Sequence, residues 1–102
     1  MSNTLAGTTW QFTAVRHDFT SFKGAFHEAG TWTQTFSTGS SFNGTYKQSP
    51  NLRSFIANVT TPDGDWAIVG SHRLAVGGGN ITVTPDSELV SQYTMPFVMT
   101  KV

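Results

Sequence analysis

Histidine, tyrosine and the acidic residues are the side chains of this chain that could carry acid–base or metal chemistry, and they are few. The sequence has three histidines (His17, His27 and His72), two tyrosines, six acidic residues and no cysteine. The lack of cysteine excludes disulfides, thiolate metal sites and cysteine nucleophiles. No two histidines have the i, i+4 or alternate-strand spacing that builds a metal site locally. We therefore expect no metal and no cofactor.

The serine and glycine patterns do not indicate catalysis either. No serine lies in the Gly-x-Ser-x-Gly sequence of a nucleophile elbow. The run Gly77-Gly78-Gly79 lacks the Lys-Ser or Lys-Thr pair that follows in a phosphate-binding loop. We interpret residues 77–80 as a hairpin turn between two strands.

Apolar and polar residues alternate through most of the chain. In residues 9–15, Trp10, Phe12 and Ala14 share one face, and Gln11 and Thr13 share the other. The same alternation runs through residues 31–37, 41–48, 53–60, 66–76 and 93–99. Period-two patterning rich in Thr, Phe, Trp, Val and Ile is typical of half-buried antiparallel strands.

Short turn signals separate these segments. They are Thr38-Gly39-Ser40, Ser49-Pro50-Asn51, Thr61-Pro62-Asp63-Gly64-Asp65, Gly77-Gly78-Gly79-Asn80 and Thr84-Pro85-Asp86-Ser87. Proline presets φ at the first corner of a turn, and glycine accepts the positive φ that follows. A meander of seven or eight strands hides its edges by closing. We predict an all-β fold, in which residues 1–102 form one small antiparallel up-and-down β-barrel.

Residues 16–30 break the alternation. Phe19, Phe22, Phe26 and Ala29 have helical spacing, with Asp18 as a start cap and Gly30 at the end. This pattern predicts a short helix near residues 18–29 that covers one end of the barrel. The alternative is a further strand with a wide loop.

The inward faces of the predicted strands combine aromatic and polar side chains. By parity, the candidate ligand-binding residues are Trp32, Gln34, Phe36, Phe42, Tyr46, Trp66, His72 and Tyr93. A purely structural core favours Val, Ile and Leu, and an unmet buried polar group costs about 1–3 kcal/mol. Two interpretations stay open. Either these residues line an amphipathic ligand pocket, or the polar ones meet water or backbone near a barrel mouth.

Two short stretches resemble the calycins, the lipocalin-like and avidin-like barrels. Leu5-Ala6-Gly7-Thr8-Thr9-Trp10 is similar to the glycine and tryptophan with which those chains enter their first strand, although here two residues separate Gly7 from Trp10 instead of the usual one. Phe42-Asn43-Gly44-Thr45-Tyr46 resembles the Gly-Thr-Tyr strand of the avidin group. The resemblance covers roughly the first half of the chain.

The calycin resemblance implies a ligand-binding barrel with Trp10 closing its base. It also implies that Lys101 takes the place of the basic residue that packs over this tryptophan in lipocalins, a cation–π contact. Biotin binding is not implied, because the polar residues of that site have no one-to-one matches here.

These observations favour a barrel that binds a small, largely apolar molecule. The alternative is an enzyme on the same scaffold, a cyclase or isomerase that acts by positioning its substrate, with His72 and Tyr46 as candidate catalytic residues. A third possibility is a solid barrel with a structural or protein-interaction role.

The charge and hydropathy of the chain limit the kinds of partner that it can bind. Charged residues make up 12% of the chain and the formal net charge is zero, which excludes the basic footprint of a nucleic-acid binder. No stretch approaches the roughly 18 apolar residues of a membrane-spanning helix, and the first residues do not form a secretory signal. We expect a soluble, cytoplasmic protein. A homodimer is an expected assembly, because short barrels often pair to cover apolar surface.

Overall fold

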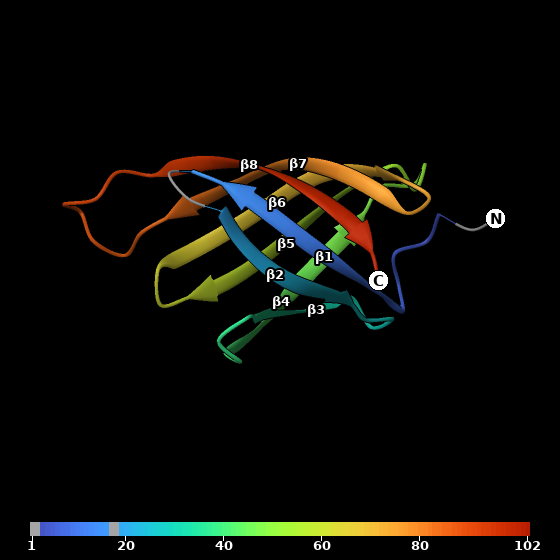
Figure 1. Cartoon of the computed structure of the whole chain (residues 1–102), viewed down its shortest axis with the longest axis horizontal. Helices are drawn as coiled ribbons and strands as arrows, with labels where there is room; N and C mark the ends of the chain where they lie inside the picture. The colour runs from blue at the N-terminus through green and yellow to red at the C-terminus, as the bar shows by residue number, and fades with distance from the viewer. Residues whose placement is uncertain (1–2, 17–18) are drawn as a thin grey trace.

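Eight antiparallel strands make up the regular structure of the computed structural model, which describes residues 3–16 and 19–102. They are β1 (Thr8–Val15), β2 (Phe19–Phe26), β3 (Thr31–Phe36), β4 (Ser41–Gln48), β5 (Ser54–Thr61), β6 (Gly64–Arg73), β7 (Val76–Thr84) and β8 (Tyr93–Lys101). Each strand pairs with the next, and β8 returns to pair with β1, so the sheet closes on itself (Figure 1). The predicted up-and-down barrel is confirmed.

The short helix expected near residues 18–29 is wrong, and its alternative, a further strand, is correct. Residues 19–26 form β2, which pairs with β1 along its whole length. Phe22 and Phe26 are four residues apart, a spacing that places them on one face of a helix and also on one face of a strand. Phe19 and Ala29, which completed the helical stripe, are both exposed. The expected start cap, Asp18, lies outside the described residues.

The hairpin turn expected at residues 77–80 is also wrong. The chain turns at residues 74–75, and Gly77, Gly78 and Gly79 all lie within β7. A Cβ atom at Gly79 would overlap the carbonyl oxygen of Val69 on the neighbouring strand. Glycine is therefore required here for close approach of two backbones, whereas the turn itself contains Leu74 with a φ of 56°.

Inward-facing glycines make room for aromatic rings. A Cβ atom at Gly24 would overlap the Trp32 indole and lie 2.7 Å from Cε1 of Phe12. At Gly70 the same atom would lie 2.8 Å from Cζ of Phe97. An eight-stranded barrel has an interior just wide enough to be filled by side chains, so a large ring on one strand requires a missing side chain on another.

The rings pack against one another along the barrel. Phe12 stacks on Phe22 at a centroid distance of 5.0 Å and meets Trp32 edge-on at 5.5 Å. Phe26 contacts Trp32, Tyr46 and Phe55 at 4.8–5.3 Å. Offset and edge-to-face pairs of this kind contribute about 0.5–1.5 kcal/mol each beyond the area they bury. The middle of the barrel is therefore filled by protein.

The residues before β1 close one end of the barrel, which we call the closed end. Leu5 is fully buried there, and Asn3 donates from its side-chain amide to the carbonyl of Leu52 and accepts from the amide of Leu74 at 3.0 Å. Leu52 and Leu74 both have positive φ. The Asn3 side chain therefore ties the segment before β1 to the β4–β5 and β6–β7 turns.

Trp10 lies near the closed end and is 1% exposed, as the calycin resemblance implied. Its strand partner is Lys101, but the Lys101 side chain is exposed, and no cation–π contact joins these two described residues. Instead, the guanidinium of Arg16 lies over the ring of Tyr93, 3.6 Å from its centroid, near the other end of the barrel.

We expect Gly24→Ala to lower the free energy of unfolding by about 1–3 kcal/mol, because overpacking a filled core forces side chains or backbone to move. Urea unfolding measures this loss. Ser21→Ala, at an exposed position of the same strand, is the matched control and should leave stability within about 0.5 kcal/mol. Equal stability of the two variants would show that the Trp32 ring does not need the space at Gly24.

Candidate functional site

The eight candidate residues lie at three levels along the barrel. Tyr46 and His72 are near the closed end, and Trp32 and Gln34 are in the middle. Phe36, Phe42, Trp66 and Tyr93 are toward the opposite end, which we call the open end. All eight are buried or half-buried, as parity predicted. The structure therefore does not bring them together in one pocket.

At the closed end, His72 belongs to a hydrogen-bonded network centred on Gln48. The Gln48 side-chain amide donates to the main-chain oxygen of Asn3 at 2.9 Å, and its nitrogen lies 3.1 Å from Nε2 of His72. Its oxygen accepts from the amide of Leu5 at 3.0 Å. Because an amide nitrogen only donates, His72 accepts through Nε2, and its neutral ring carries the proton on Nδ1. That Nδ1 is buried without a partner.

Tyr46 is also tied to main chain. Its hydroxyl donates to the carbonyl of His27 at 2.7 Å. Burial raises the pKa of the Tyr46 phenol, and the negative charge of Glu28 raises it further. This hydroxyl stays neutral near pH 7 and serves as a donor that fixes the β2–β3 turn. The roles proposed for Tyr46 and His72 in ligand binding or catalysis stay predictions.

In the middle of the barrel, Trp32 and Gln34 form a buried pair. The indole nitrogen of Trp32 donates to Oε1 of Gln34 at 3.2 Å. Both residues are 0% exposed, and the side-chain nitrogen of Gln34 has no partner. A buried amide without a hydrogen-bond partner lowers the free energy of unfolding by about 1–3 kcal/mol, so this side chain destabilises the core.

Toward the open end, aromatic rings form a layer across the barrel. Trp66 from β6 meets Phe22 from β2 and Phe36 from β3, each at a centroid distance of 5.8 Å. Phe36 continues the contact to Phe42 at 5.9 Å. Trp66 is only 3% exposed, and its buried indole nitrogen has no hydrogen-bond partner.

Above this layer the barrel wall is interrupted. The pairing of β2 with β3 begins only at Phe22, and the pairing of β4 with β5 begins only at Gly44. The first residues of β2 therefore extend past β3, and those of β4 extend past β5. A cavity of about 430 Å³ lies between them and the β5–β6 turn. We call it the mouth cavity. It is lined by Phe19, Thr20, Ser21, Phe36, Ser37, Thr38, Ser40, Phe42, Thr61, Pro62 and Asp63.

Sequence reasoning found only two of the residues that line the mouth cavity, Phe36 and Phe42. It missed Phe19, which is 77% exposed and had been assigned to the helical stripe. It also missed Pro62 and Asp63, which were interpreted only as turn residues. The sequence alone offers no signal that marks these residues as part of one cavity, although loops at barrel mouths commonly carry binding residues.

No group of histidine, aspartate and glutamate side chains in residues 3–16 and 19–102 is arranged to hold a metal ion. Over the same residues, no helix has the length and apolarity needed to cross a membrane. Comparison with known proteins gave no match, because no family model fits the chain and no curated protein or solved structure is significantly similar to it.

The closed-end network predicts a pH dependence of stability. Burial lowers the pKa of His72. In the unfolded chain histidine takes up a proton below about pH 6.5, which the folded ring resists, so folding stability should fall as the pH drops below that value. Above about pH 6.5, His72 adds no pH dependence to the folding stability.

Urea unfolding between pH 7.5 and 5 measures this slope. His72→Gln should flatten it, because glutamine can still accept from Gln48 but does not titrate. His27→Gln, at an exposed position near the same end, is the control and should keep the slope. An unchanged slope in His72→Gln would assign the acid sensitivity to other groups.

Proposed function

We propose that this protein binds a small, largely apolar ligand in the mouth cavity at the open end of its barrel. The observation that carries the proposal is the cavity itself, walled by the rings of Phe19, Phe36 and Phe42. Its volume of about 430 Å³ is within the range of small-molecule sites. Exposed rings around a concave surface lose their contact with water when a ligand binds, and this drives association.

The ligand lies at the mouth rather than deep in the barrel, because the interior is already filled. Trp66 reaches across to Phe22, and Trp32 occupies the space above Gly24. Access to these levels would require rings to leave the core. The mouth needs no such movement.

Polar groups around the mouth cavity would orient the ligand. The hydroxyls of Ser37, Thr38 and Ser40 can donate or accept, and Asp63 adds a carboxylate.

The eight-stranded barrel is compatible with the calycin resemblance of the sequence, and small-molecule binding is what that resemblance implies. The enzyme alternative has less support, because His72 and Tyr46 each have a partner at the closed end, away from the mouth cavity. We therefore propose a binding protein rather than a cyclase or isomerase.

A neutral fluorescent probe tests the proposal. N-phenyl-1-naphthylamine should bind saturably with enhanced emission. Phe42→Ala should weaken binding at least tenfold, since losing a ring contact of about 1.4 kcal/mol changes the dissociation constant by that factor. Thr38→Arg, at an exposed lining position, should weaken binding without disturbing the core.

Two variants serve as controls. Lys47→Ala is exposed on the same strand as Phe42 but near the other end, and it should bind as the wild type does. Tyr46→Phe distinguishes the mouth from the base. If Tyr46→Phe weakens binding and Thr38→Arg does not, the ligand lies deeper in the barrel and the mouth proposal is wrong.

A further inference from the structure

A second cavity, of about 500 Å³, lies at the closed end and has a different character from the mouth cavity. It is lined by Asn3, Arg53, Ser71, His72, Arg73, Val76, Gly77 and Gly78. Arg53 lies in the β4–β5 turn, and Arg73 is the last residue of β6. No acidic residue is among the lining residues. We call it the arginine cavity.

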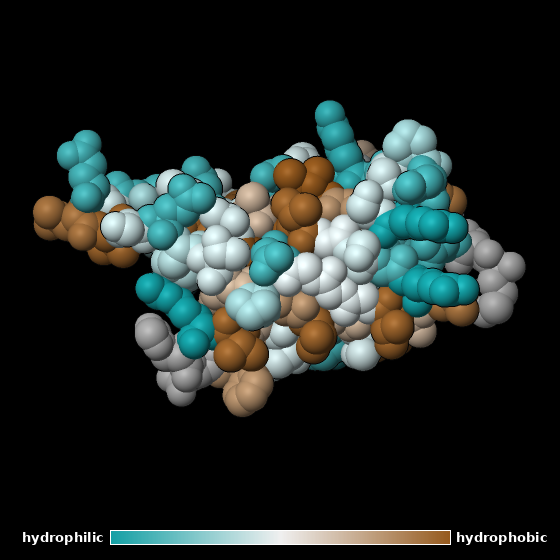
Figure 2. Space-filling model, turned by 90° about the horizontal axis from the view of Figure 1, so that it is seen from above, coloured by the Kyte–Doolittle hydropathy of each residue, from teal (hydrophilic) through white to brown (hydrophobic). Residues whose placement is uncertain are grey.

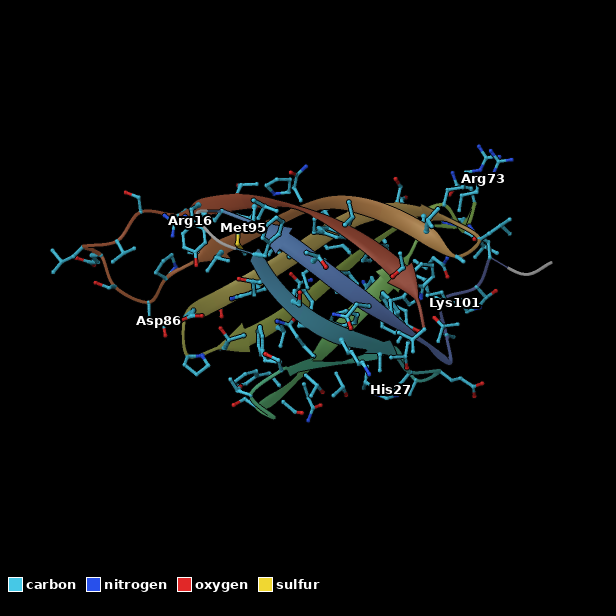
Figure 3. The ribbon with its side chains drawn as sticks, in the orientation of Figure 1. Arg16, His27, Arg73, Asp86, Met95 and Lys101 are labelled. Atoms are coloured by element: carbon cyan, nitrogen blue, oxygen red, sulfur yellow. The ribbon has the colours of Figure 1, made fainter. Side chains whose placement is uncertain are left out.

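Neither arginine of this cavity has an anionic partner in the part of the chain that the structure describes. Within the described residues, neither the Arg53 nor the Arg73 guanidinium takes part in an ion pair or a hydrogen bond. Both side chains are exposed, and Figure 3 shows Arg73 projecting from the end of the barrel. Two like charges that line one cavity repel each other, and a bound anion would remove that repulsion.

Basic and acidic side chains are concentrated at opposite ends of the barrel. Arg53, Arg73, Lys47 and Lys101 lie at or near the closed end, where Glu28 is the acidic residue among those described. The open end carries Asp63, Asp65, Asp86 and Glu88 with Arg16. Figure 3 shows Arg73 and Lys101 at the closed end and Asp86 with Arg16 at the open end, and Figure 2 shows hydrophilic side chains at both ends of the molecule. Basic residues outnumber acidic ones among the described residues of the closed end, so this end attracts anions more strongly than the acidic open end does.

We propose that the arginine cavity binds a phosphate monoester. Two guanidinium groups supply two positive charges and planar forks of N–H donors, which match the charge of about −1.5 to −2 and the several oxygens of a phosphate monoester near pH 7. A carboxylate carries half of that charge. The Ser71 hydroxyl adds a further donor.

The rest of the arginine cavity suits the organic part of the ester. Val76 is 60% exposed and offers an apolar surface beside the arginines. Gly77 and Gly78 add backbone to the cavity wall, and the space that a side chain would take at each is already filled by neighbouring strands. This site is separate from the mouth cavity and does not depend on the proposed function.

Titration followed by NMR amide shifts tests the proposal with four probes at constant ionic strength. They are phenyl phosphate, inorganic phosphate, benzoate and chloride. We expect phenyl phosphate to bind most tightly, then inorganic phosphate, with shifts at the amides of Ser71, Gly77 and Gly78. Benzoate presents the same ring with a carboxylate and should bind at least tenfold more weakly than phenyl phosphate.

Substitutions identify the groups that bind. Arg53→Gln and Arg73→Gln should each weaken phenyl phosphate binding at least tenfold. Lys47→Gln removes the same charge from the same end but does not line the cavity, so it should change binding less than twofold. All three positions are exposed, so folding should be retained. Binding of the neutral probe at the mouth should be unchanged in all three.

Three results would overturn the inference. One is equal losses in Lys47→Gln and Arg73→Gln, which would indicate nonspecific attraction to a basic end. Another is benzoate or chloride binding as tightly as phenyl phosphate. The third is that none of the four probes shifts the amides that line the cavity.

Discussion

The close packing of aromatic rings over glycines is the constraint on which the rest of this barrel depends. An eight-stranded barrel is narrow, and this one holds Trp10, Trp32 and Trp66 together with several phenylalanines. The rings fit because strands that face them lack a side chain, as at Gly24 below Trp32 and at Gly70 below Phe97. Once the interior is filled in this way, space for a ligand remains only where the packed core stops. The mouth cavity and the arginine cavity lie at the two ends of the barrel.

The sequence predicted the barrel because alternation is a local property that survives folding. In β6, Trp66, Ile68, Gly70 and His72 all face inward, as the period of two requires. The two errors in the fold have physical causes. Phe22 and Phe26 satisfy helical and extended periodicity equally well, and only their pairing with β1 decides between them. The glycines of β7 looked like a turn because glycine is common in turns, whereas here they meet neighbouring backbone.

The candidate site was harder to predict because parity states which face a residue occupies but not its depth along the barrel. Trp32 and His72 both face inward, yet one lies in the middle of the core and the other is bonded to Gln48 at the closed end. Depth depends on how far each strand is shifted against its neighbours. That shift leaves the start of β2 without a partner on β3 and so creates the mouth cavity. No property of Phe19 or Asp63 alone indicates it.

The closure of the barrel by its first and last strands has a consequence for biosynthesis. Hairpins between successive strands can form as the chain emerges from the ribosome, since each strand needs only the one just made. The outer edge of β1, however, stays unpaired until β8 has been made, and the last residue of β8 is Lys101. The Asn3 side chain likewise cannot form its hydrogen bond with the amide of Leu74, 71 residues later, until that residue has been made. Until β8 has been made, the nascent protein carries an open sheet edge and an uncovered aromatic interior, which are the features that cellular chaperones bind and that promote aggregation.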